Sequence, residues 1–146
     1  MVELKHYSLV KPTLNTPFHI DFEWWQKNDR EWRVHMLSCL PAEYQQAFAD
    51  SSEEQVDWID PETAEVQRVD GLQHTLINYA ANTPDFVTAR TTLVESIFRL
   101  FLANGNSPMT PTELGERLNR PPMTILKTVS SVRVYRGIRP CPECVQ

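Results

Sequence analysis

Residues 107–131, SPMTPTELGERLNRPPMTILKTVSS, constrain the fold more than any other part of the chain. Thr110 can accept a hydrogen bond from the amide of Glu113, and the Glu113 side chain can accept one in return, which makes a capping box at a helix start. Pro111 suits the first helical position because its missing N–H is not needed there. A short turn then precedes Pro122, which is expected to start a second helix. We therefore predict two short helices joined by a tight turn.

A third helix is expected before this pair. The stretch 85–106, DFVTARTTLVESIFRLFLANGN, repeats apolar residues at helical spacing, and Asn104-Gly105 is a C-terminal stop signal. The apolar face of this helix comprises Phe86, Leu93, Ile97, Leu100 and Phe101. The faces that pack the two short helices together would carry Leu114, Leu118, Ile125 and Val129. Three helices connected in this way form a helix-turn-helix arrangement.

This part of the chain resembles the winged-helix family of helix-turn-helix DNA-binding domains, found in many bacterial transcription regulators. The matching features are the T-P-x-E-L-x-x-x-L pattern at 110–118, the apolar anchors Ile125 and Val129, and the β-prone VRVYRGIRP at 132–140, where a wing would lie. The resemblance covers residues 88–140, under half of the chain. It implies a winged-helix-like helix-turn-helix module in that part of the chain. Together with the apolar periodicity of the residues before it, the sequence predicts a mainly α (α+β) protein, in which a helical N-terminal region with one β-hairpin precedes this module.

The resemblance further implies that residues 122–131 enter the major groove of double-stranded DNA. Their exposed hydroxyl and ammonium groups suit phosphates and base edges. The three arginines that follow cannot all face one side of a strand, but a bend at Gly137 could bring two of them to the backbone or the minor groove. The predicted DNA-binding residues are Thr124, Lys127, Thr128, Ser130, Ser131, Arg133, Arg136 and Arg139. The alternative is that Lys127 and the arginines are solvated, or pair with the acidic N-terminal region.

The distribution of charge supports a module that faces a polyanion. The chain carries a net charge of −5, but residues 1–109 hold 8 Lys/Arg against 16 Asp/Glu, whereas residues 110–146 hold 6 against 3. Because the basic residues gather in the C-terminal quarter, the split favours nucleic-acid contact there. The overall acidity favours a different function, in which the module binds a protein.

Residues 1–87 are predicted to form an acidic α+β region that mediates dimerisation or partner binding. Residues 1–17, with two prolines, are expected to be an extended arm or edge strand. One amphipathic helix is expected from Asp21, its N-cap, to Leu40, with Pro41 ending it. Its apolar face would comprise Phe22, Trp25, Trp32, Met36, Cys39 and Leu40.

A second helix and a hairpin follow in this region. AEYQQAF at 42–48 is expected to be a short helix. The period then changes to two, which predicts one strand around Val56 and Trp58, a turn at 60–63, and a returning strand through Val66 and Val69. LQHTLINYAAN at 72–82 resumes helical spacing.

Cys141 and Cys144 form a C-P-x-C pair in the tail 141–146, typical of half a zinc or iron site. Tetrahedral zinc needs four ligands, and the sequence holds no second pair. Cys39 with one histidine could complete a site if the tail folded back, or two chains could each donate a pair. The candidate histidines are His6, His19, His35 and His74.

A redox pair and a plain tail are the other interpretations of these cysteines. The odd number of cysteines, with Cys39 inside a helical pattern, favours reduced thiols over a secreted disulfide framework. We expect no cofactor, with zinc at Cys141 and Cys144 as the alternative.

The sequence as a whole predicts a small cytoplasmic DNA-binding protein, a bacterial transcription regulator. It has no apolar run near the length of a membrane-spanning helix and no signal-peptide pattern, so we expect no membrane partner. It has no phosphate-binding loop or hydrolase motif, so we expect no enzymatic activity. The alternative function is a protein-interaction adaptor, or a subunit of a larger assembly in which the winged helix binds protein.

Overall fold

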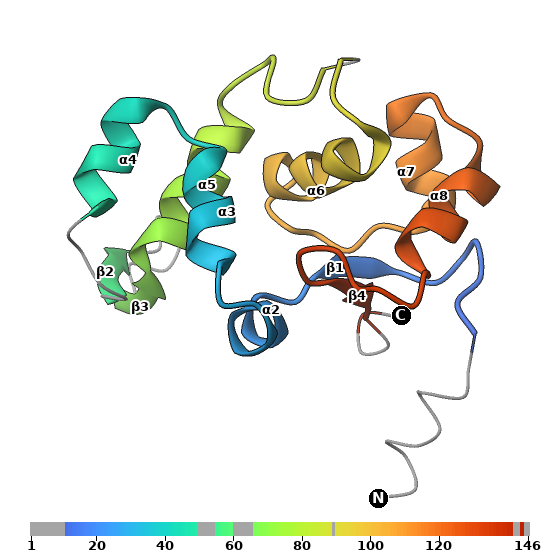
Figure 1. Ribbon diagram of the computed structural model, residues 1–146, viewed down its shortest axis with the longest axis horizontal. Coiled ribbons are helices and arrows are strands. Elements are labelled where there is room, and N and C mark those ends of the chain that lie inside the picture. The colour runs from blue at the N-terminus through green and yellow to red at the C-terminus, as the bar shows by residue number, and fades with distance from the viewer. Residues whose placement is uncertain (1–10, 50–54, 60–65, 89, 142–143, 145–146) are drawn as a thin grey trace, which may run out of the picture.

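The computed structural model describes residues 11–49, 55–59, 66–88, 90–141 and 144. For residues 47–49, 55–59 and 66–70 it describes the backbone only. In this part of the chain, seven helices accompany two small antiparallel strand pairs, which confirms a mainly helical α+β protein. Figure 1 shows one helix, α6 (Leu93–Ala103), in the middle of the molecule. On one side lie α7 (Pro111–Leu118) and α8 (Pro122–Val129), and on the other lie α3 (Trp32–Ser38), α4 (Ala42–Ala49) and α5 (Gly71–Ala81). None of the described helices is both long enough and apolar enough to cross a membrane.

The first helical region is divided by a break. α2 spans Phe22–Asn28 and α3 spans Trp32–Ser38, so the prediction of one helix from Asp21 to Leu40 is wrong. The predicted N-cap is confirmed, because the Asp21 carboxylate accepts a hydrogen bond from the Trp24 amide (3.0 Å).

Asp29 accounts for the break. Its backbone is extended, and its carboxylate accepts hydrogen bonds from the Glu31 amide (2.9 Å) and from the Trp25 indole (3.0 Å). The bond from the Glu31 amide, followed by that from Trp25, holds the pKa of Asp29 below its usual value. A side chain that binds nearby amides in this way competes with the helix for them. The predicted apolar face is still buried on both sides of the break, through Trp25, Trp32 and Met36 among others.

The next elements match the prediction from sequence. α4 spans Ala42–Ala49, and the hairpin consists of β2 (Gln55–Ile59) and β3 (Val66–Asp70), paired antiparallel from Gln55 opposite Asp70 to Ile59 opposite Val66. The predicted turn at 60–63 lies outside the described residues. α5 follows at Gly71–Ala81.

α6 spans Leu93–Ala103 and forms the centre of the core. The prediction that this helix already includes Phe86 is wrong, because Thr92 is extended and its side chain caps the helix by accepting from the Glu95 amide. Phe86 is nevertheless buried, ahead of the helix. The C-terminal end is as predicted, with Asn104 as the cap residue.

The tight helix pair is confirmed. α7 spans Pro111–Leu118, α8 spans Pro122–Val129, and both bonds of the capping box are present, from the Thr110 amide to Glu113 (2.8 Å) and from the Glu113 amide to Thr110 (3.2 Å). Gly115 lets the helices approach, because a Cβ there would lie 2.7 Å from the carbonyl oxygen of Arg120.

A short strand near the N-terminus lies between two C-terminal segments. β1 (Phe18–Ile20) pairs antiparallel with β4 (Ile138–Pro140), with His19 opposite Arg139. On its other edge, Phe18 exchanges two backbone hydrogen bonds with Met109 (2.9 and 3.0 Å).

Asn106 extends this second edge of β1 through its side chain. Its amide oxygen accepts from the Ile20 N–H (2.8 Å), and its amide nitrogen donates to the Ile20 carbonyl (2.9 Å). In the described part of 132–140, where a wing was predicted, the only strand is β4, and its partner is β1 rather than a second wing strand.

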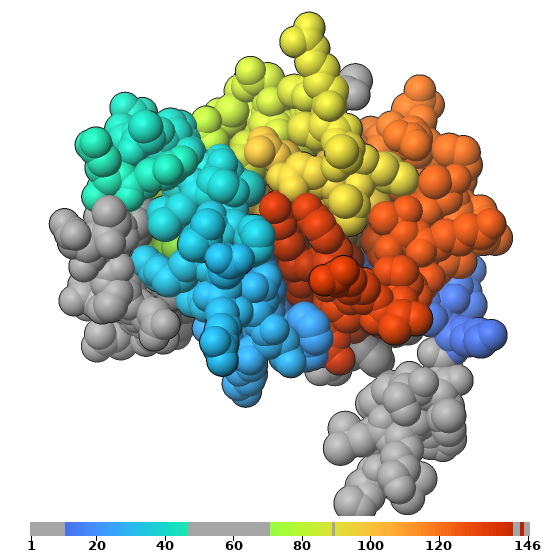
Figure 2. Space-filling model, in the orientation of Figure 1, coloured from blue at the N-terminus to red at the C-terminus, as the bar shows by residue number. Residues whose placement is uncertain are grey.

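One hydrophobic core joins the N-terminal and C-terminal parts. A single cluster of buried side chains runs from Phe18 and Trp25 through α6 to Ile125 and Ile138. Figure 2 shows the C-terminal segment, in red, seated between the blue and cyan N-terminal helices and the orange α7–α8 pair. The two halves of the sequence are therefore packed around the same core.

Gly137 seats this C-terminal segment against α2, and its replacement tests the contact. Gly137 has φ +79°, and a Cβ there would lie 2.9 Å from the Trp25 Cβ and 3.0 Å from the Asp21 carbonyl oxygen. We predict that Gly137→Ala lowers the free energy of unfolding by about 2–4 kcal/mol, since it adds a clash to backbone strain. Chemical denaturation measures the loss.

Gly105→Ala is the matched control for this prediction. Gly105 also has a positive φ (+68°), but a Cβ there would meet nothing within 4 Å. It should cost only about 1 kcal/mol, from backbone strain alone. Equal losses for the two variants would show that the Gly137 contact is not as the structure has it.

Candidate functional site

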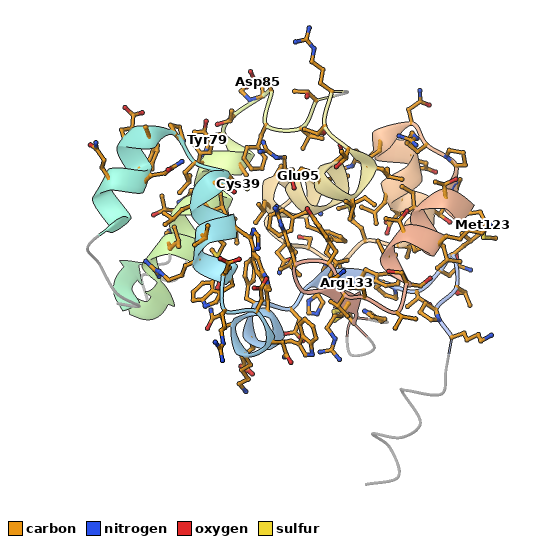
Figure 3. The ribbon with its side chains drawn as sticks, in the orientation of Figure 1. Cys39, Tyr79, Asp85, Glu95, Met123 and Arg133 are labelled. Atoms are coloured by element: carbon orange, nitrogen blue, oxygen red, sulfur yellow. A yellow bond between two sulfur atoms is a disulfide. The ribbon has the colours of Figure 1, made fainter. Side chains whose placement is uncertain are left out.

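The second helix of the tight pair presents one face to the outside. Ile125 is fully buried against α7, while Lys127 is exposed and Thr124 and Thr128 are half-buried. Figure 3 shows Met123 at the outer edge of the molecule, pointing away from the core. The predicted DNA-binding residues of α8 thus include one freely exposed cation, Lys127.

The hydroxyl groups near the end of α8 already donate hydrogen bonds within the chain. Thr128 donates to the Thr124 carbonyl (2.8 Å), and Ser130 donates to the Leu126 carbonyl (2.6 Å). Ser131 donates to the Arg133 carbonyl (2.9 Å). Each hydroxyl oxygen can still accept a bond, but its proton is engaged on the protein.

Several predicted residues meet at a cleft beside the C-terminal end of α8. Its volume is about 350 Å³. The cleft is lined by Thr128, Ser131, Arg133 and Arg136 from the predicted set, together with Asp29, His35, Val94, Val134 and Tyr135. Arg133 is exposed and forms no ion pair with any residue that the structure describes. Lys127 and Arg133 are therefore the predicted cations that are available to an outside anion.

Arg136 is held inside the protein by Glu95. Its guanidinium lies 2.8 Å from a Glu95 carboxylate oxygen and over the ring of Phe98, and only 17% of the side chain is exposed. Glu95 also pairs with Arg99 (2.9 Å) and accepts a hydrogen bond from the Tyr135 hydroxyl (3.0 Å). Burial, together with the nearby Glu95 carboxylate, raises the pKa of Tyr135 to about 12.

Arg139 is also paired within the chain. It lies 3.2 Å from the Asp21 carboxylate and over the ring of Trp24. Asp21 belongs to the acidic N-terminal region. This ion pair therefore fits the alternative interpretation, in which the arginines pair with that region instead of contacting DNA. DNA contact by Arg136 or Arg139 stays a prediction, and it would require these ion pairs to open.

Two further arginines carry exposed charge that the sequence interpretation did not assign to a site. Arg117 lies in the last turn of α7 and Arg120 just beyond it. Both line a second cleft, which shares no lining residue with the first and also includes Val87, Thr88, Thr91 and Leu93. The partners of Arg136 and Arg139, which are Glu95 and Asp21, were missed as well. Nothing in the local sequence pattern links residues 41 and 118 positions apart.

The cysteine pair lies against β1. Cys141 is 3% exposed, and its amide donates to the Pro17 carbonyl (2.8 Å). The structure joins Cys141 to Cys144 by a disulfide, so the expectation of reduced thiols is wrong for this pair. Cys39 is a buried free thiol, and burial raises its pKa.

One of the four candidate histidines lies beside these cysteines. His19, Cys141 and Cys144 place their potential ligand atoms within 4.8 Å of one another. The sequence could not choose among the histidines, because the choice depends on the pairing of β1 with β4.

The Glu95 cluster makes a specific prediction about stability. Glu95→Gln removes the negative charge that faces Arg136 and Arg99, and it leaves a largely buried guanidinium without a counter-charge. We predict a loss of about 1–3 kcal/mol in the free energy of unfolding, measured by chemical denaturation.

Glu23→Gln is the control for this substitution. Glu23 pairs with Lys27 at 3.9 Å, but the two side chains are 84% and 75% exposed. Loss of this exposed ion pair should change the free energy of unfolding by less than about 0.5 kcal/mol. If Glu95→Gln were equally mild, Arg136 would not depend on Glu95 for its position.

Comparison with known proteins does not assign a function to these residues. No protein-family model, curated protein or solved structure matches the chain. A proposal for its function therefore depends on the arrangement of its own residues.

Proposed function

We propose that the protein binds double-stranded DNA through α8 and the segment 130–136, as a small transcription regulator. The observation that carries this proposal is the exposed face of α8, which bears Lys127 and ends at the cleft that Arg133 lines. A helix of eight residues is about 12 Å long, and its width fits a major groove about 12 Å across.

The supporting groups divide between phosphates and bases. Lys127 and Arg133 provide charge, and Thr128 and Ser131 line the same cleft as Arg133. Hydroxyls whose protons are engaged on backbone carbonyls accept bonds, so they suit base amino groups better than phosphate oxygens. Phosphate contact in this proposal therefore depends mainly on the two cations.

Two available cations set the expected strength of binding. Each phosphate contact contributes about −0.9 to the slope of log K against log salt concentration, so one chain should show a slope near −2. A slope of this size indicates few phosphate contacts for a DNA-binding protein. Two copies of the chain on adjacent half-sites would double the slope, and dimerisation through the N-terminal region is part of the proposal.

A second function is favoured by apolar exposure in the first turn of α8 and just beyond its C-terminal end. Met123 is 50% exposed, and Val132 is fully exposed. Neither side chain suits phosphates, whereas both suit an apolar protein surface. On this alternative, the same face binds a protein partner within a larger assembly.

Substitution of the two cations tests DNA binding. We predict that Lys127→Ala and Arg133→Ala each weaken binding to a pooled genomic duplex several-fold at low salt, and each lower the salt slope by about 1. Fluorescence anisotropy at several salt concentrations gives both quantities. The matched control is Lys27→Ala, an exposed lysine on α2, which should change neither.

The outcomes separate the two functions. If wild-type protein does not bind the duplex pool even at low salt, or if Lys127→Ala and Arg133→Ala leave the salt slope unchanged, the DNA proposal is wrong. A stoichiometric partner that co-purifies from nuclease-treated extract, and is lost on Met123→Ser but not on Lys27→Ala, would support the protein-binding function instead.

A further inference from the structure

We propose that His19, Cys141 and Cys144 bind a zinc ion when the two cysteines are reduced. The three residues come from the two ends of the chain and meet at the β1–β4 pair. Their ligand atoms, one imidazole nitrogen and two sulfurs, all lie within 4.8 Å of one another. This site is separate from α8 and does not depend on DNA binding.

The strand register brings the histidine to the cysteines. His19 lies directly opposite Arg139, so the two side chains project from the same face of the pair. Cys141 is two residues beyond Arg139, which returns it to that face. The bond from the Cys141 amide to the Pro17 carbonyl (2.8 Å) continues the pairing past β4 and fixes Cys141 diagonally across from His19.

A turn then brings the second sulfur back. The Cys144 amide donates to the Cys141 carbonyl (3.0 Å), and the Cα atoms of the two cysteines are 5.4 Å apart. This bond and this separation hold the two sulfurs close enough to bind one metal ion, at the C-x-x-C spacing common in zinc sites. Cys141 is buried and Cys144 is half-buried, so the site lies at the edge of the core.

The donor set suits zinc. Thiolates and a neutral imidazole are its common protein ligands, at about 2.3 Å for sulfur and about 2.0–2.1 Å for nitrogen. His19 is half-buried, and no residue in the described ranges forms a hydrogen bond or ion pair with its ring. The described residues supply three ligands, which leaves one tetrahedral position for water, as in open zinc sites, or for a ligand from the rest of the chain.

The disulfide and the zinc site exclude each other. A phosphine reductant opens the Cys141–Cys144 bond and is oxidised to its oxide, while water supplies the oxygen and the two thiol protons. Zinc then binds both sulfurs as thiolates, and the two protons are released to solvent. The pair is therefore expected to bind metal only after reduction.

Cobalt is the spectroscopic probe for this site. Reduced protein should bind one Co²⁺ per chain, with a thiolate-to-cobalt charge-transfer band and the intense visible bands of tetrahedral cobalt, and Zn²⁺ should displace it. Protein with the disulfide intact should show neither band. Cys144→Ser should abolish the tetrahedral spectrum.

The histidine variants decide the assignment. His19→Gln should weaken Co²⁺ binding by at least about 10-fold, as losses near a metal site commonly do, whereas His35→Gln should bind as wild type. His19→Cys should restore tight binding and strengthen the charge-transfer band, because a third thiolate replaces the imidazole. Far-ultraviolet circular dichroism of each variant identifies any that fail to fold.

Two results would overturn the proposal. One is reduced wild-type protein that shows no charge-transfer band with Co²⁺. The other is folded His19→Gln protein that binds Co²⁺ with the affinity and spectrum of wild type. If His19→Gln does not fold, the His19→Cys spectrum takes the place of the second result, and an unchanged charge-transfer band there overturns the proposal.

Discussion

The rest of the structure depends on the pairing of β1 along both of its edges. On one edge, Phe18 exchanges backbone bonds with Met109, and the Asn106 side chain satisfies both backbone groups of Ile20. On the other edge lies β4. A strand of three residues is too short to be stable alone, so it is held by partners from two later parts of the chain. The same contacts bring together α2, the end of α6 and the C-terminal segment.

This constraint decides which charges are available for binding. Because β4 is fixed on β1, Arg139 meets Asp21, and the Gly137 turn lies on Trp25 while Arg136 reaches Glu95. These arginines stabilise the junction between the N-terminal helices and the C-terminal segment. Lys127 and Arg133 form no ion pair with a carboxylate among the described residues. They are therefore the residues that we propose contact the phosphates of DNA. The pairing also places His19 beside the two cysteines, and it thereby creates the proposed metal site.

Local signals in the sequence predicted the elements that depend on local contacts. The capping box at Thr110 and the end of α6 at Asn104 follow from residues a few positions apart. The β2–β3 pair follows from the period-two pattern within each of its strands. The break at Asp29 was missed, because apolar spacing is unchanged across it and only the side-chain bonds to Glu31 and Trp25 show it. The β1–β4 pair joins residues more than 100 positions apart, and no periodicity reports such a contact. The arginine partners and the choice of His19 depend on that pair, so they were beyond sequence reasoning.

Native-state hydrogen exchange at three backbone amides tests the central role of β1 most directly. The amides of Phe18, Met109 and Cys141 donate to Met109, Phe18 and Pro17, respectively, and so report both edges of the strand. If β1 holds the two halves of the chain together, these amides exchange only on global unfolding, with the same free energy as the amides of α6. Exchange at the rate of exposed loops, while α6 stays protected, would contradict this account.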